Sequence, residues 1–167
     1  MENKIITKDQ QPILRFAADR MKTFSITINI ESSRAPEFID ISEEVCAAVK
    51  DSGVRLGFVI VFSRHTTAAI KINELEPLLL KDMEDFLERL SPKEGNYRHN
   101  DFSIRTVNMN EDECPNGHAH CQHLALSSSE TIPIVDGQPS LGNWQRIFMI
   151  ELDRPRSREI LVQVVGV

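Results

Sequence analysis

The chain has 167 residues, 41% of them hydrophobic, and a net charge of −6, a composition typical of one globular domain. This acidic balance argues against a broad nucleic-acid-binding surface, and no apolar run approaches the ~20 residues that a membrane helix requires. The three cysteines form no Cys-x-x-Cys motif, which indicates free thiols in a reducing compartment, and no signal-peptide pattern follows the N-terminus. We therefore expect a cytoplasmic protein without nucleic-acid or membrane partners.

The first 20 residues show no clear period, so we predict an N-terminal extension over 1–20 and a single domain over 21–167. Apolar and polar residues alternate over 24–30, which predicts a half-buried strand. Ser42 is a candidate N-cap of a helix with two glutamates in its first turn. Gly53 is placed to end that helix, since glycine commonly follows the last helical residue.

The middle of the chain predicts two strands, a helix and a long polar segment. Residues 56–62 form an apolar run that is typical of a buried strand, and a short strand is expected over 69–72. Pro77 opens an amphipathic helix at the first position, where proline is tolerated, and Ser91 with the following proline ends it. The polar residues of 91–117 form a connection too long to be a mere linker, so we expect a functional role for it.

Three further strands are expected near the C-terminus, over 131–135, 146–152 and 159–165. With the preceding elements they give roughly seven strands and two or three helices. The predicted fold class is therefore α+β, with a β-rich single domain.

The histidines are the most conspicuous candidate functional residues. Three of the five, His118, His120 and His123, lie within six residues. Imidazole is the commonest protein metal ligand, and three imidazoles with an open position suit a catalytic zinc-type ion. A helix over 118–126 would separate His118 from His120 by about 200° and favour His120 with His123, whereas an extended segment would place His118 and His120 on one face. A third ligand would then come from His99 or His65.

Hydroxyl, guanidinium and imidazole groups gather in residues 63–67, where a strand is expected to end. This combination suits an anion such as phosphate, although an ordinary polar strand end is an equally good interpretation. Asn73 and Glu74 follow the next strand, and a carboxylate at a strand end can act as a general base or a metal ligand.

Two other segments carry candidate binding residues. Trp144, the only tryptophan, stands beside Gln145 after a glycine turn, and it is expected either in the core with a hydrogen-bonded N–H or against a ligand. Three arginines lie within residues 154–158, where they could hold phosphate, pair across an oligomer interface or form a solvated charged hairpin.

Taken in order from Met21 to the C-terminus, these segments resemble the YjbQ-like family, often described as secondary thiamine-phosphate synthases. The residues that carry the resemblance are His65-Thr66-Thr67-Ala68-Ala69, Asn73-Glu74, Asp82, Tyr97, His99, Ala119-His120, Ser129, Ile132-Pro133-Ile134, Gly137, Gly142, Trp144-Gln145, Glu151 and Pro155-Arg156.

The resemblance implies two packed, mainly antiparallel sheets with flanking helices, assembled as a homotrimer with pockets near the subunit boundaries. It implies a divalent metal ion, zinc-like or magnesium, with the candidate ligands His99, His120, His65 and His118. The candidate catalytic residues are His65, Glu74 and Asp82. The candidate substrate-binding residues are Thr66, Thr67, Asn73, Trp144, Gln145 and Arg156.

Three functions follow as hypotheses. The first is a metal-assisted enzyme acting on phosphorylated small molecules, with the thiamine-phosphate synthase activity that the resemblance implies. The second is a metal-dependent hydrolase that uses the same residues on another substrate. The third is a non-catalytic trimeric binding protein, in which case the histidines would be dispensable.

Overall fold

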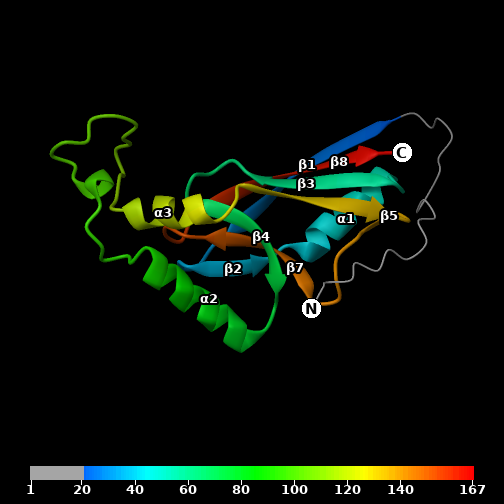
Figure 1. Cartoon of the computed structure of the whole chain (residues 1–167). Coiled ribbons are helices and arrows are strands. Elements are labelled where there is room, and N and C mark those ends of the chain that lie inside the picture. Colours follow the sequence, from blue (N-terminus) through cyan, green and yellow to red (C-terminus); the bar gives the residue numbers. More distant parts are fainter. Residues whose placement is uncertain (1–20) are drawn as a thin grey trace, which may run out of the picture.

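The computed structural model describes residues 21–167, and the extension predicted over residues 1–20 lies outside them (Figure 1). The elements in order are β1 (Lys22–Glu31), β2 (Glu37–Asp40), α1 (Ser42–Ser52), β3 (Gly57–Ser63), β4 (Ala68–Glu74), α2 (Pro77–Leu90), a 3-10 turn (Arg98–Asn100), α3 (Gly117–Ala125), β5 (Ser129–Val135), β6 (Gln138–Pro139), β7 (Gln145–Glu151) and β8 (Ser157–Gly166). No helix of this described part is both long and apolar enough to cross a membrane.

The strands form two sheets, and every strand pairing is antiparallel. The larger sheet has the order β1-β8-β3-β5-β6 and the smaller one the order β2-β7-β4. The predicted α+β class with two mainly antiparallel sheets is confirmed. The very short strands β2 and β6 were not predicted, because four and two residues are too few to show a period.

The main core lies between the two sheets and against α1. Side chains alternate between the faces of a strand, so Ile70 of β4 and Met149 of β7 point to this core, where they meet Val162 of β8. Val45 and Val49 give α1 its buried face in the same core. Gly53 ends the helix with a φ of 65°, which glycine adopts without steric cost, as predicted.

The opposite face of the small sheet is covered by α2 and α3. Phe148 and Ile150 of β7 point to this side, where they pack with Leu87 of α2 and Ala119 of α3. Figure 1 shows both helices beside the small sheet, with the segment that joins them projecting away from the sheets. This packing fixes α3, and with it the clustered histidines, near one end of β4 and β7.

Three local expectations are resolved by the structure. Ser42 is the first residue of α1 rather than its N-cap, because its hydroxyl accepts the Ile147 backbone N–H at 2.8 Å, and Asp40 accepts the Ser42 N–H at 2.9 Å. The histidine segment is helical, so the alternative of an extended segment is wrong. The short strand predicted over 69–72 is longer, since β4 runs on to Glu74.

Candidate functional site

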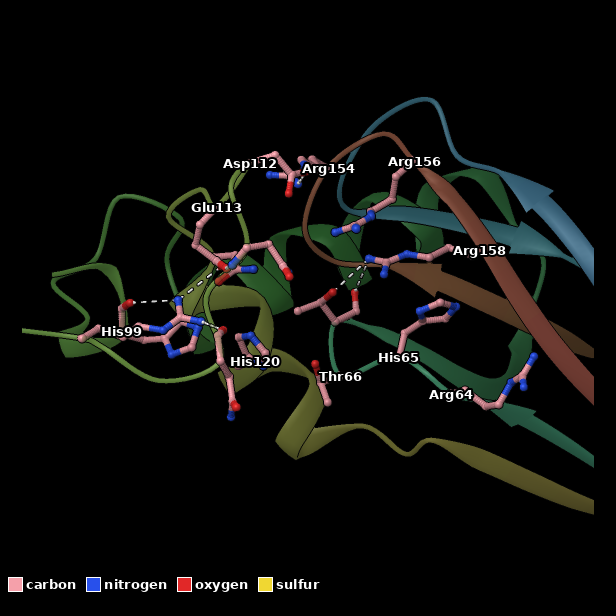
Figure 2. Close-up of a pocket in the computed structure, with 15 residues that line it drawn as sticks. Arg64, His65, Thr66, His99, Asp112, Glu113, His120, Arg154, Arg156 and Arg158 are labelled. Atoms are coloured by element: carbon pink, nitrogen blue, oxygen red, sulfur yellow. Dashed lines mark hydrogen bonds and ion pairs between the residues drawn. The ribbon is translucent and has the colours of Figure 1, made fainter. Parts of the chain in front are cut away.

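A pocket of about 430 Å³ lies where the ends of the two sheets meet α3 and the segment before it (Figure 2). One wall comes from the turn after β3 and from the β7–β8 connection, and the other from residues 99–120. Five arginines and three histidines line it. The volume lies within the range of small-molecule sites, and the lining is rich in hydrogen-bond donors.

The floor of the pocket is a buried ion pair between Arg158 of β8 and Glu151 of β7. Nε and Nη2 of Arg158 each donate to the carboxylate at 2.6 Å, and the two side chains are only 3% and 0% exposed. Glu151 also accepts the Ser32 hydroxyl at 3.2 Å and the Asp153 backbone N–H at 3.0 Å. Nη2 of Arg158 donates further to Thr67 Oγ1 at 2.9 Å. These hydrogen bonds fix the pair in place.

One amino group of Arg158 has no partner among the described residues. Nε and Nη2 are used as above, whereas Nη1 makes no hydrogen bond within residues 21–167 and is not among their buried unpartnered atoms. Arg158 lines the pocket, so this group is available to a ligand. The side chain of Arg156 also keeps N–H donors without a partner among the described residues, because only its Nη1 is paired, with Asp153 at 3.2 Å.

Each pocket arginine is held by a carboxylate. The pairs are Arg64–Glu159 at 2.7 Å, Arg105–Glu113 at 3.2 Å, Arg154–Asp112 at 3.2 Å, Arg156–Asp153 at 3.2 Å and Arg158–Glu151 at 2.6 Å. A guanidinium carries five N–H donors, and one carboxylate cannot occupy all of them. The carboxylates therefore orient the arginines and lower the net charge of the pocket while leaving donors for a ligand.

His65 follows β3 and lies on the sheet side of the pocket. Its Nε2 accepts the backbone N–H of Glu159 at 3.1 Å. Burial lowers the pKa of His65, and the nearby cations Arg158 and Arg156 lower it further. The neutral imidazole is therefore favoured.

His99 and His120 form a second histidine group on the other wall. Their ring centroids are 4.6 Å apart and the rings meet at 67°, edge to face. Nε2 of His99 is buried without a hydrogen-bond partner in the described structure. Burial lowers the pKa of His120, and the neighbouring His99 lowers it further.

The segment between the 3-10 turn and α3 closes one side of the pocket. Arg105 holds it from within, because it donates to the Asn108 carbonyl at 2.7 Å and to Glu113 at 3.2 Å. Asp112 ties the segment to Arg154 of the β7–β8 connection. The polar segment predicted to be functional thus forms a wall of the candidate site.

Asn100 positions the start of α3. Its Oδ1 accepts the backbone N–H groups of Asn116 and Gly117 at 3.0 and 2.8 Å, while Asn116 makes no capping hydrogen bond of its own. A side chain from the preceding turn thereby satisfies N–H groups that a helix start leaves unpaired. The same contact holds the turn that carries His99 against the helix that carries His120.

The helix separates the three clustered histidines. His118 is buried and does not line the pocket, in agreement with the predicted angle from His120. His123 does not line it either and lies 3.4 Å from the Ser128 hydroxyl. Within residues 21–167, no group of three or more His, Cys, Asp or Glu side chains is arranged to hold a metal ion.

The pH dependence of stability follows from these histidines. Burial lowers the pKa of His118 and His120 in the folded protein, whereas the unfolded chain keeps ordinary values near 6.5. As the pH falls, the histidines of the unfolded chain therefore become protonated at a higher pH than those of the folded protein. The free energy of unfolding is then greatest above about pH 6.5 and decreases as the pH falls below this value. We expect urea titrations to give a lower free energy of unfolding at about pH 5.5 than at about pH 7.5. His118→Gln should shrink the difference, and higher stability at the lower pH would contradict the argument.

Six of the predicted site residues come together in this pocket: His65, Thr66, Thr67, His99, His120 and Arg156. Glu74 and Gln145 do not, because they pair with each other at the far end of β4 and β7. Seven residues of strand separate that end from Thr67 by roughly 20 Å. Trp144 is 69% exposed, so it neither belongs to the core nor lines the pocket.

Asn73 and Asp82 also lie away from the pocket. Asn73 lines a smaller, mainly apolar hollow between α2 and the small sheet, where its amide contacts the sulfur of Met83. Asp82 is exposed on α2. The roles predicted for the residues outside the pocket therefore receive no support from its geometry.

Arg158, Glu151 and Arg105 were not among the predicted site residues. The sequence did contain a signal for Arg158. Side chains alternate between the two faces of a strand, so Arg158 lies on the same, buried face of β8 as Ile160 and Val162. A charged residue on such a face requires a buried partner. The ion pair of Arg105 with Glu113 could not be inferred, because both residues lie in an irregular segment without a helical or strand period.

The comparisons with known proteins agree with one another. The model of a family described as "UPF0047 protein YjbQ-like" matches residues 26–167. A UPF0047 protein of Methanothermobacter thermautotrophicus is 40% identical over 87% of this chain and 94% of its own length. A YbjQ-like protein of Sulfolobus solfataricus has a solved structure with a TM-score of 0.80 and 32% identity, covering 89% of this chain and 100% of that one. The solved structure of a hypothetical protein of Aeropyrum pernix has a TM-score of 0.76 and 31% sequence identity. The match covers 86% of this chain and 98% of that one.

These comparisons correct the function that the resemblance implied. The Sulfolobus protein is described as being of unknown function, and the relatives carry only the UPF0047 family name. None of the proteins named above is described as a thiamine-phosphate synthase or as a metal-dependent enzyme. The prediction of a metal-assisted thiamine-phosphate synthase is therefore wrong, because the matched family has no such established activity.

Proposed function

The chain belongs to the UPF0047 YjbQ-like family, and from the pocket that it builds we propose that it binds a small organic molecule through a phosphate or carboxylate group. The observation that carries this proposal is Arg158, whose side chain is only 3% exposed and is fixed by Glu151, while Nη1 has no partner among the described residues. A buried arginine with an unused donor is a preorganised partner for an oxyanion.

The surroundings of Arg158 support an anionic ligand. Arg156 keeps unpaired donors on the same wall, and Thr66 also lines the pocket. The pocket volume of about 430 Å³ suits a metabolite rather than a macromolecule. A phosphorylated small molecule remains our preferred ligand, since phosphate offers several acceptor oxygens to these donors.

Enzymatic turnover of the ligand stays a prediction. His120 is the candidate general base, because its lowered pKa keeps the imidazole neutral and able to accept a proton. A divalent metal ion also stays a prediction. Nε2 of His99 is free and His120 is adjacent, but two imidazoles do not complete a ligand set within the described residues, so we derive no step through a metal. The predicted homotrimer and cytoplasmic location likewise remain predictions.

Inorganic sulfate tests the binding proposal without knowledge of the natural ligand. We expect calorimetric titration at low ionic strength to show saturable binding of sulfate to the full chain. Arg156→Gln should weaken it about tenfold, the effect of losing a hydrogen bond to a charged group. The control is Arg55→Gln, because Arg55 is also an ion-paired surface arginine, with Asp136 as its partner, but lies at the other end of β3. Absence of saturable binding, or equal weakening in both variants, would contradict the proposal.

A further inference from the structure

The hydrogen bond between Glu159 and His65 determines where the imidazole carries its proton. A backbone N–H can only donate, so Nε2 of His65 must be the acceptor in their 3.1 Å contact. A neutral imidazole has one N–H and one acceptor nitrogen. The proton of His65 therefore resides on Nδ1.

The surroundings of His65 keep it in this state. Arg158 and Arg156 disfavour a positive charge on the ring, and burial acts in the same direction. A proton on Nε2 would also point at the amide hydrogen of Glu159. Nδ1 makes no hydrogen bond to any described residue, and the ring lies on the pocket wall with Arg158 (Figure 2).

We infer that His65 is a fixed hydrogen-bond donor to the ligand, with the Nδ1–H group acting beside Nη1 of Arg158. A subsite of donors alone selects a group that only accepts, such as an ionised carboxylate, sulfate or fully ionised phosphate. This inference rests on the proposed anion binding and specifies how the anion is recognised. It makes His65 a specificity-determining residue and leaves it no free lone pair for the catalytic base or metal ligand predicted from the sequence.

The tautomer is directly measurable in the wild-type protein. Long-range ¹H–¹⁵N correlation spectra distinguish a protonated ring nitrogen from an acceptor nitrogen, and the His65 signals are assigned by their loss in His65→Asn. We expect a protonated Nδ1 and an unprotonated Nε2, with Nδ1 showing the largest shift when inorganic sulfate is added. A proton on Nε2, alone or together with one on Nδ1, would overturn the inference.

Three substitutions test the donor role. His65→Asn places an amide N–H near the position of Nδ1, whereas His65→Gln extends its amide toward the position of Nε2. We expect His65→Ala and His65→Gln to weaken sulfate binding about tenfold and His65→Asn to stay within about threefold of wild type. Thermal unfolding of each variant confirms that it folds, and the tautomer itself is read from the spectra of the wild-type protein. Gln rescuing better than Asn would overturn the donor role.

The two proposals fail in different ways. Sulfate binding that depends on Arg156 but is unaffected by His65→Ala would overturn the role of His65 and leave the proposed function intact. An absence of sulfate binding in the wild type would overturn both. In that case the spectra would still report whether the Glu159 amide fixes the tautomer.

Discussion

Replacing Arg158 by methionine is expected to lower the free energy of unfolding by about 3–5 kcal/mol, because it leaves Glu151 charged, buried and without its cation. The carboxylate is 0% exposed and receives two of its hydrogen bonds, at 2.6 Å each, from this one side chain. The remaining donors, the Ser32 hydroxyl and the backbone N–H groups of Asp153 and Arg154, cannot neutralise the charge. Urea unfolding followed by circular dichroism measures the change.

Two further variants test whether burial is the cause. Arg64→Met breaks an ion pair with Glu159 of similar length, 2.7 Å, whose side chains are 53% and 56% exposed. Exposed pairs contribute about 0–1 kcal/mol, so this variant should unfold close to wild type. The double variant Arg158→Met with Glu151→Met should recover part of the loss, because no unpaired charge remains buried. A loss below about 1 kcal/mol in Arg158→Met would contradict the buried-charge argument.

Under the proposed function, Arg158 would serve stability and ligand binding through different atoms. Nε and Nη2 hold Glu151 and Thr67, which fixes the β7–β8 connection, and Nη1 is left for the pocket. Stability alone does not require the pair, because replacing both members of a buried ion pair by well-packed apolar residues is often neutral or stabilising. A buried arginine that lines the pocket is therefore consistent with the proposed recognition of an anion.

The longer strands and the first two helices could be predicted because their periods are local. The alternation over 24–30 corresponds to β1, and the amphipathic pattern after Pro77 corresponds to α2, whose start also uses Glu76 to accept two backbone N–H groups. The register between paired strands is not local, because it depends on residues far apart in the sequence. The pairing of Ala68 with Glu151 brings the turn after β3 to the arginines, and no pattern within either strand specifies it.

The errors at the site have the same origin. Asn73 and Glu74 were predicted to follow a short strand over 69–72 and to act at the site. The observed β4 continues through Glu74 and carries that carboxylate to the other end of the sheet. The His99–His120 contact joins a turn to a helix across an irregular segment, so the sequence indicated candidates but could not place them together by spacing.

Replacing Gly117 by alanine is expected to destabilise the protein by about 1–3 kcal/mol, the cost of forcing extra atoms into a packed region. In an exposed helix the same change stabilises by roughly 0.5–1 kcal/mol, because alanine is the better helix former. Here the added Cβ would lie 2.5 Å from Tyr97 Cβ and 2.8 Å from its Cγ. These atoms are the base of the side chain, so rotation of the ring cannot relieve the overlap and the backbone must move.

The movement required by Gly117→Ala separates the two walls of the pocket. Tyr97 begins the turn that carries His99, and Gly117 begins the helix that carries His120, so displacing one from the other also breaks the capping contact of Asn100. Thermal unfolding measures the loss of stability, and the imidazole spectra should show changed His99 and His120 signals with those of His65 retained. The matched control is Gly142→Ala, whose Cβ would meet only the flexible amide of Gln145, at 3.3 Å, and should be near neutral. If Gly117→Ala were neutral or stabilising, the tight contact between the turn and α3 could not be what holds the two histidines together.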